Sequence, residues 1–328
     1  MASAEVGDEQ RGEDPTVVEL ERRAAAFLGQ EEAVYLPTAT MGNQIALQIL
    51  SVPGNELIVE QSAHIMISEL GGAAVHSGLQ TRGLPGRRGR LSAADLHAAI
   101  PPSDPLHRPR PAVLALENTH NSAGGAVWPL AELRETVGAA RELGLAVHLD
   151  GARIANAAVA TGIAASEIGV LFDTVTLCLS KGLGCPLGAV VAGSGELMAR
   201  ARVAKHRFGG AMRQAGIVAA AGLYALEHNL DRLADDHARA RRLAEGWATR
   251  GVPVDLAGVE TNFVQVDVGA LGLSSAEATA LLGRAGVGLS GTVAPGLLRA
   301  VTHLDIDDSD IDAAIELGSG ALETRVGA

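Results

Sequence analysis

The sequence is poor in cysteine and aromatic residues and has no excess of basic charge. Two cysteines, Cys178 and Cys185, are too few for a disulfide framework, and their spacing matches no metal site, so we expect a reducing compartment and no metal. Aromatic residues make up only 2% of the chain, so Ala, Val, Leu and Gly must supply most of the core. The formal net charge of -12 at pH 7 argues against nucleic acid or an anionic membrane as the main partner.

Long hydrophobic runs are also missing. The longest, AGIVAAAGLYAL at 215–226, is too short to cross a bilayer. The N-terminal MASAEVGDEQRGEDPT is acidic and has no apolar segment typical of a secretory signal. The one basic stretch, RGLPGRRGR at 82–90, lies among Gly and Pro, which favours a solvated loop over a binding patch. We therefore expect a cytoplasmic protein.

Short apolar runs alternate with amphipathic helices over the first 230 residues. The runs lie at 33–36, 55–60, 112–117, 145–149, 173–180 and 188–194. Strands separated by helices predict βα units and a mostly parallel sheet covered on both faces. Beyond about residue 230 a long charged helix precedes further mixed elements, so we expect a large domain over 1–230 and a smaller α+β domain over 231–328.

Polar residues follow five of the expected strands. They are Thr38-Ala39-Thr40, Ser62 with His64, Glu117 through His120, Asp150 with Arg153, and Ser180-Lys181. In an open α/β sheet, ligands bind outside the carboxyl ends of the strands. Because all five ends should converge on one edge, we expect a site there.

Lys181 stands out in the stretch CLSKGLGCP at 178–186. It could be a surface lysine capping a turn. However, the glycines at 182 and 184 allow a ligand to approach the backbone closely. A neutral lysine amine is a nucleophile that forms Schiff bases with aldehydes.

The other strand-end residues are ambiguous when each is taken alone. Asp150 could cap the helix that follows it, or it could hold a pyridine nitrogen protonated. Thr38-Ala39-Thr40 could be an ordinary helix N-terminus or a phosphate site. His64 and His120 could be satisfied polar residues or catalysts. Together they offer the groups that a pyridoxal 5'-phosphate (PLP) enzyme needs.

Several segments resemble the threonine aldolase family. They are PTATMGNQIAL (37–47), LENTHNSAGG (116–125), HLDGARIANA (148–157), LSKGLGCPLGAVVAGS (179–194), GGAMRQAG (209–216) and LRAVTHLD (298–305). This family comprises low-specificity L-threonine aldolases of the β-eliminating lyase group, which are PLP enzymes of fold type I. The resemblance implies an α/β fold with a mostly parallel seven-stranded sheet in a large domain and a small α+β C-terminal domain.

The resemblance also implies a reaction and an assembly. The reaction would be reversible cleavage of L-threonine or L-allo-threonine to glycine and acetaldehyde, catalysed by an aldehyde-lyase. The partner would be a second copy of the chain, in a homodimer or a dimer-of-dimers tetramer with shared active sites.

Residue roles follow from the same resemblance. Lys181 would carry PLP, Asp150 would pair with its pyridine nitrogen, and His64 would stack on its ring. Thr38, Ala39 and Thr40 would bind the phosphate, helped by Arg213 from a neighbouring subunit. Arg153, beside the cofactor, and Arg299 would hold the substrate carboxylate. Either His64 or His120 would take the proton of the β-hydroxyl.

Some positions depart from the family pattern. An Arg-Ser-Asp-Thr motif expected near the start is absent, from which we expect a shortened N-terminal arm. Gln10, Arg11 and Ser68 replace apolar or aromatic residues, and Ala39 replaces a glycine whose φ would matter if positive. These changes leave two alternatives open: a related lyase or aldolase for another β-hydroxy amino acid, and a weakly active PLP-binding homologue.

Overall fold

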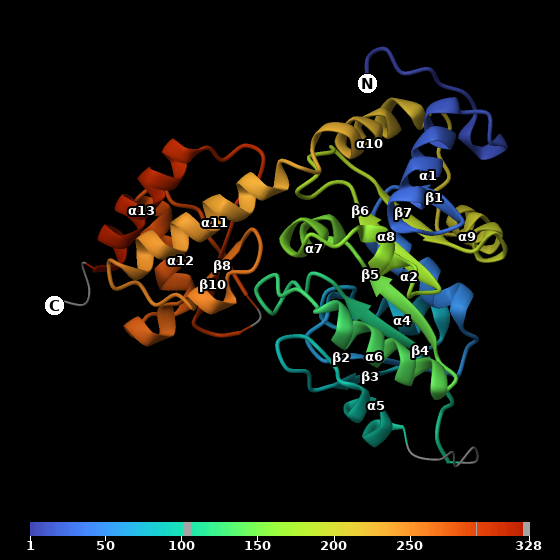
Figure 1. The fold of residues 1–328 in the computed structure, drawn as a ribbon, viewed down its shortest axis with the longest axis horizontal. Helices are drawn as coiled ribbons and strands as arrows, with labels where there is room; N and C mark the ends of the chain where they lie inside the picture. The colour runs from blue at the N-terminus through green and yellow to red at the C-terminus, as the bar shows by residue number, and fades with distance from the viewer. Residues whose placement is uncertain (101–106, 293, 324–328) are drawn as a thin grey trace. The chain divides into compact units, whose positions relative to one another are not determined.

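The computed structural model describes residues 1–100, 107–292 and 294–323, which form two compact units. The first contains Met1–Thr119 and Trp128–Leu230, and the second contains His120–Val127 and the described residues from Asp231 onward (Figure 1). Among the described residues, no helix combines the length and apolar character needed to cross a membrane.

A seven-stranded sheet forms the centre of the first unit. Its order is β1-β7-β6-β5-β4-β2-β3. The strands are β1 (Glu32–Leu36), β2 (Glu56–Glu60), β3 (Gln80–Leu84), β4 (Pro111–Glu117), β5 (Ala146–Asp150), β6 (Thr174–Cys178) and β7 (Ala189–Gly193). The strands from β6 to β3 run parallel, and β7 is antiparallel to both β6 and β1. The predicted mostly parallel sheet is confirmed.

Helices bury this sheet. The first unit contains η1 (Glu9–Arg11), α1 (Pro15–Leu28), α2 (Ala39–Leu50), α3 (His64–Ile67), α4 (Gly72–Ser77), α5 (Ala93–Ala99), α6 (Leu130–Glu142), α7 (Ile154–Thr161), α8 (Ala165–Gly169), α9 (Gly195–Arg207) and α10 (Gly216–His228). Helix α2 packs with α4 and α9, and α1 packs with α8 and α10. All residues of β2, β6 and β7 are buried, because a sheet covered on both faces has no solvent side.

The basic stretch 82–90 is not entirely a loop, so that expectation was partly wrong. Its first three residues belong to β3, an edge strand that pairs in parallel with β2. Arg82 on β3 lies 2.6 Å from Glu56 on β2, which neutralises a cation within the strand pair. Alternating polar residues and Gly83 hid this strand, since edge strands are often polar.

The second unit is a smaller α+β body. Its antiparallel sheet has the order β8-β10-β9. The elements are α11 (Leu233–Ala248), η2 (Leu256–Gly258), β8 (Phe263–Asp267), η3 (Val268–Leu271), α12 (Ser275–Arg284), β9 (Ser290–Gly291), β10 (Leu297–Val301) and α13 (Asp308–Glu323). The core includes the fully buried Trp247, whose indole donates to the carbonyl of Ala314.

Candidate active site

The strand order explains why the polar strand ends of the first unit meet. Strands β6, β5, β4 and β2 are successive neighbours and parallel, so their carboxyl ends share one edge. Lys181 follows β6, Asp150 ends β5, and His64 follows β2. Strand β1 also ends at this edge, because two antiparallel steps through β7 restore its direction.

Lys181 lies in a tight loop between β6 and β7. The N–H of Leu179 donates to Gly188 O at 3.0 Å, and the N–H of Gly184 donates to Lys181 O at 2.9 Å. Gly184 and Gly188 have φ values of 77° and 119°, which side chains with a Cβ rarely adopt. The loop therefore holds a half-buried lysine at the strand end.

The chain contains only two lysines, which sharpens the assignment of any lysine chemistry. The other, Lys205 on α9, is 2% exposed and lies 2.5 Å from Glu9. An ammonium held in a buried ion pair is a poor nucleophile. Lys181 is therefore the lysine suited to form a covalent bond with an aldehyde.

Asp150 is a buried carboxylate, 3% exposed, with defined donors on both oxygens. Oδ1 accepts from the N–H of Ala152 at 3.1 Å, and Oδ2 accepts from Asn43 Nδ2 at 2.9 Å. The N-cap residue of α7 is Arg153 rather than Asp150. Helix capping therefore does not explain this aspartate.

A network of buried side chains connects Asp150 to His64. Asn43 Nδ2 also donates to Glu69 Oε1 at 2.8 Å, and His64 Nδ1 lies 2.9 Å from the same oxygen. Asn43 Oδ1 lies 3.1 Å from Nε2 of His148, which is completely buried. Burial lowers the pKa of His148 to about 4, so its ring is neutral near pH 7.

The N-terminus of α2 presents the predicted hydroxyl-rich turn. Thr38 is the N-cap residue, and its hydroxyl accepts from the N–H of Met41 at 3.2 Å. Thr38 and Thr40 are exposed. Ala39 is the first helical residue and is not among the described non-glycine residues with positive φ, so its Cβ causes no backbone strain.

Two predicted arginines of the first unit occupy different surroundings. Arg153 is half-buried at the start of α7, three residues after Asp150. Arg213 is exposed and forms an ion pair with Asp8 at 2.5 Å. Gln10 and Arg11 lie nearby in the chain, in the exposed turn η1.

The second unit brings the remaining predicted residues, His120 and Arg299, into one body. Arg299 Nη1 donates to Asn121 Oδ1 at 2.7 Å, and its guanidinium carbon lies 4.9 Å from the centroid of the Phe263 ring. Burial lowers the pKa of Arg299 from 12.5, and its Nε has no hydrogen-bond partner among the described residues. His120 Nδ1 accepts from the N–H of Ala123 at 3.3 Å.

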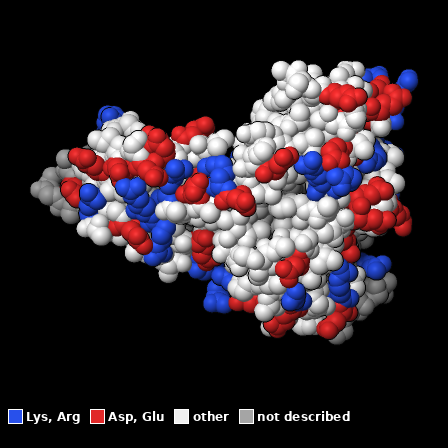
Figure 2. Space-filling view, turned by 45° about the horizontal axis from the view of Figure 1, so that its top comes forward, with Lys and Arg blue, Asp and Glu red and all other residues white. Residues whose placement is uncertain are grey.

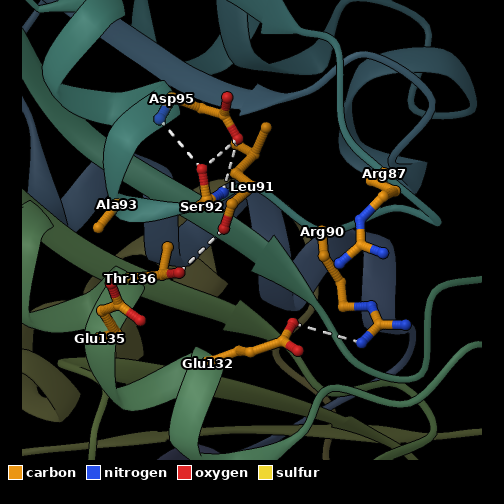
Figure 3. A pocket seen from close by; sticks show the side chains of 9 residues that line it. All are labelled: Arg87, Arg90, Leu91, Ser92, Ala93, Asp95, Glu132, Glu135 and Thr136. Atoms are coloured by element: carbon orange, nitrogen blue, oxygen red, sulfur yellow. Dashed lines mark hydrogen bonds and ion pairs between the residues drawn. The ribbon is translucent and has the colours of Figure 1, made fainter.

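A separate cavity of about 350 Å³ lies beside α5 and α6 (Figure 3). Its lining is Arg87, Arg90, Leu91, Ser92, Ala93, Asp95, Glu132, Glu135 and Thr136. Ser92 and Asp95 form a capping box, and Arg90 pairs with Glu132 at 3.4 Å. These two pairs satisfy four of the polar residues that line the cavity.

Comparison with known proteins identifies the class to which this fold and site belong. The chain matches the Beta-eliminating lyase family model over residues 1–270, and it belongs to that family. It is 41% identical over 308 residues to the low specificity L-threonine aldolase of Escherichia coli K12, covering 93% of this chain and 89% of the relative. The resemblance to the threonine aldolases is confirmed.

Solved structures establish the same fold. The threonine aldolase of Leishmania major matches with a TM-score of 0.82 at 20% identity, covering 98% of this chain and 92% of that chain. A serine palmitoyltransferase from S. paucimobilis, solved with bound PLP, matches with a TM-score of 0.75 at 18% identity, covering 100% and 82%. The predicted fold type I architecture is therefore confirmed.

Three residues of the network were not predicted from the sequence: Asn43, Glu69 and His148. Signals in the sequence pointed to two of them. Asn43 lies with Gln44 among the apolar residues of α2, and His148 interrupts the apolar run of β5. Buried polar groups require partners, so such interruptions mark a network.

Proposed function

We propose that this chain is a PLP-dependent carbon–carbon lyase that cleaves L-threonine or L-allo-threonine to glycine and acetaldehyde, reversibly. The convergence of Lys181, the buried Asp150 and the His64 network at one sheet edge carries this proposal. The sequence relationship to low-specificity L-threonine aldolases supports the choice of substrate.

The first unit offers the groups that PLP requires. Lys181 would bind the aldehyde carbon, and the buried carboxylate of Asp150 retains acceptor capacity for a protonated ring nitrogen. His64 would stack on the ring. The phosphate would bind at the N-terminus of α2, where backbone N–H groups and the hydroxyls of Thr38 and Thr40 favour an anion. When bound, PLP accepts the electron pair left by the broken Cα–Cβ bond.

Thr176 supports this fit. It stands opposite Asp150 in the register of β5 and β6, and its hydroxyl is buried without a hydrogen-bond partner among the described residues. Buried hydroxyls normally have partners, so a polar ligand beside Asp150 would complete the site. Arg213 of a neighbouring subunit would contribute a further phosphate contact.

Arg153 and Arg299 would orient the substrate by its carboxylate. Charge-assisted pairs from guanidinium groups fix a carboxylate in direction as well as position. Asn121 and Phe263 already constrain the Arg299 side chain, which reduces the entropy lost on binding. His64 or His120 would take the proton of the β-hydroxyl, because imidazole changes charge near neutral pH.

A second candidate is a related lyase or aldolase that acts on another β-hydroxy amino acid. Ser68 favours it, because this exposed, small residue ends α3 four positions after His64, where the family often has an aromatic ring. A smaller residue there would leave room for a larger substrate side chain. The products distinguish the reactions. Any such aldolase releases glycine, but the aldehyde released with it depends on the substrate side chain, whereas a β-eliminating enzyme releases no glycine.

The same relationship suggests how the molecule assembles and where it acts. We infer a homodimer or a dimer-of-dimers tetramer, supported by exposed apolar residues on helices of the first unit, namely Val18, Val203, Ile217 and Tyr224. Two buried free cysteines support a cytoplasmic location. Acidic and basic side chains are interspersed on the face drawn in Figure 2, which suits a small substrate better than a polyanion.

An aldehyde assay tests the proposed function. The purified chain loaded with PLP should release acetaldehyde from L-threonine or L-allo-threonine. Lys181→Ala should abolish release, whereas Lys205→Arg should retain it because the ion pair with Glu9 survives. If the wild-type protein releases no acetaldehyde from either isomer, threonine cleavage is wrong.

A further inference from the structure

Glu69 is a buried acidic residue near the sheet edge, with hydrogen-bond partners on both carboxylate oxygens. Its side chain is 0% exposed. Oε1 receives Asn43 Nδ2 at 2.8 Å and lies 2.9 Å from His64 Nδ1, while Oε2 receives Gln44 Nε2 at 2.5 Å. Donors therefore meet both oxygens, as a buried carboxylate requires.

These contacts fix where the proton on His64 lies. A carboxylate only accepts hydrogen bonds, so Nδ1 of His64 must carry the hydrogen that faces Glu69. In neutral His64, the unprotonated nitrogen is then Nε2, which can accept a proton. Glu69, five positions further along the chain, thus determines which ring nitrogen of His64 carries the proton.

Asn43 connects the pair of Glu69 and His64 to Asp150 by hydrogen bonds. Its amide nitrogen gives one hydrogen to Glu69 and the other to Asp150, so its orientation is determined by two acceptors. The amide oxygen must then accept, which places a hydrogen on Nε2 of His148. Nδ1 of His148 accepts from the Thr174 hydroxyl at 2.9 Å, as the neutral ring allows.

We propose that Glu69 is a positioning residue of the active site, which sets the tautomer of His64 and is linked to Asp150 through Asn43. The inference rests on the proposed function for its catalytic meaning, although the proton position itself does not. His64, Glu69 and Asp150 have ligand atoms within 4.8 Å of one another, but the amide hydrogens of Asn43 between the two carboxylates favour hydrogen bonding over a cation.

The electrostatic surroundings agree with this role. The hydrogen bond to Glu69 is the largest cause that raises the pKa of His64 above 6.5, ahead of the charges of Asp150, Glu69 and Glu117, while burial opposes the rise. Glu117 also accepts from the backbone N–H of His64 at 2.7 Å. Glu69 is hydrogen-bonded to the ring itself.

Titration by NMR tests the proposal in the full-length, PLP-loaded protein. Histidine rings labelled with ¹³C and ¹⁵N report tautomer and pKa, and a His64→Asn variant assigns the signal among the 10 histidines. The wild-type ring should carry its neutral-state proton on Nδ1. Glu69→Gln should lower the pKa of His64 and weaken this tautomer preference.

Two controls keep the test sharp. Glu56→Gln removes another buried glutamate, which pairs with Arg82 rather than His64, and should leave the titration of His64 unchanged. If Glu69→Gln does not fold, the wild-type tautomer still decides, since a proton on Nε2 contradicts the proposal. An unchanged pKa in folded Glu69→Gln also contradicts it.

The result is separable from the proposed function. A tautomer on Nδ1 and a shifted pKa, together with no acetaldehyde release, would refute threonine cleavage and support the role of Glu69. Acetaldehyde release, together with a His64 pKa that Glu69→Gln leaves unchanged, would support threonine cleavage and refute the role of Glu69.

Discussion

At the scale of residues, the polar groups beneath the site are buried and hydrogen-bonded to one another. His148 is enclosed on β5, neutral, and hydrogen-bonded on both ring nitrogens. It holds Asn43, which in turn contacts Asp150. A buried network of this kind is rigid only when every member has its partner.

His148 should make the folded state sensitive to acid. Its pKa is about 4 in the folded chain and near 6.5 when exposed, so the unfolded chain binds a proton first as the pH falls. The contribution to stability is present above pH 6.5 and is lost between pH 6.5 and 4. A difference of this size corresponds to about 3 kcal/mol.

Urea unfolding of wild type and His148→Asn at several pH values from 7 to 4.5 measures this effect. The variant should start less stable, because Asn43 loses a partner, but should lose less stability as the pH falls. If the free energy of unfolding changes with pH equally in wild type and variant, the buried neutral state of His148 is contradicted.

At the scale of elements, the close approach of α2 to β6 places the helix N-terminus at the sheet edge. Gly42 makes this approach possible, because a Cβ there would lie 2.9 Å from Thr176 Cγ2 and 3.0 Å from its Oγ1. Glycine inside a helix normally costs stability, and the close packing against Thr176 explains why a glycine occupies position 42.

Gly42→Ala should therefore destabilise the fold by about 1–3 kcal/mol through overpacking against Thr176. Gly138→Ala is the matched control, since Gly138 also lies within a helix, α6, and has nothing within 4 Å of an added Cβ. That control should stabilise the protein by about 0.5–1 kcal/mol. Equal effects of the two substitutions in thermal unfolding would refute the role of Gly42.

The elements that could be predicted from the sequence are those whose own residues form a recognisable pattern. Strands β2, β4 and β5 are short apolar runs, and the polar residues that follow them marked the edge of the sheet. Two features were not visible. Strand β3 is formed by pairing with β2, a contact that includes Arg82 with Glu56. Residues 120–127 join the second unit through distant contacts such as Thr261 Oγ1 to Gly125 O.

The candidate site was only partly predictable for the same reason. Lys181 and Asp150 follow apolar strands, so their positions could be inferred from the sequence alone. The link from Asp150 through Asn43 to Glu69 joins a strand to α2 and to the turn after α3. No local pattern encodes contacts of that kind.

At the scale of the whole molecule, one buried ion pair joins segments far apart in the sequence. Lys205 on α9 meets Glu9, 196 residues away, and Glu9 also accepts from the N–H of Met212 at 3.2 Å. This contact fixes the N-terminal segment against the loop that contains Arg213. The sequence positions of the three residues gave no indication of it.

Removing one partner of this pair should cost about 3–5 kcal/mol, because a buried charge is left unpaired. Lys205→Met should be less stable than the double variant Lys205→Met, Glu9→Leu, because the double variant leaves no unpaired buried charge. Urea unfolding of both variants and wild type measures the difference. A double variant less stable than Lys205→Met would contradict this account.

Reductive trapping tests the central claim most directly, namely that Lys181 is the residue that binds PLP. The full chain is loaded with PLP, reduced with borohydride, digested and analysed by mass spectrometry. With two lysines in the sequence, the outcome is unambiguous. The account predicts a pyridoxyl group on Lys181 and none on Lys205, and a label on Lys205 or on neither lysine would contradict it.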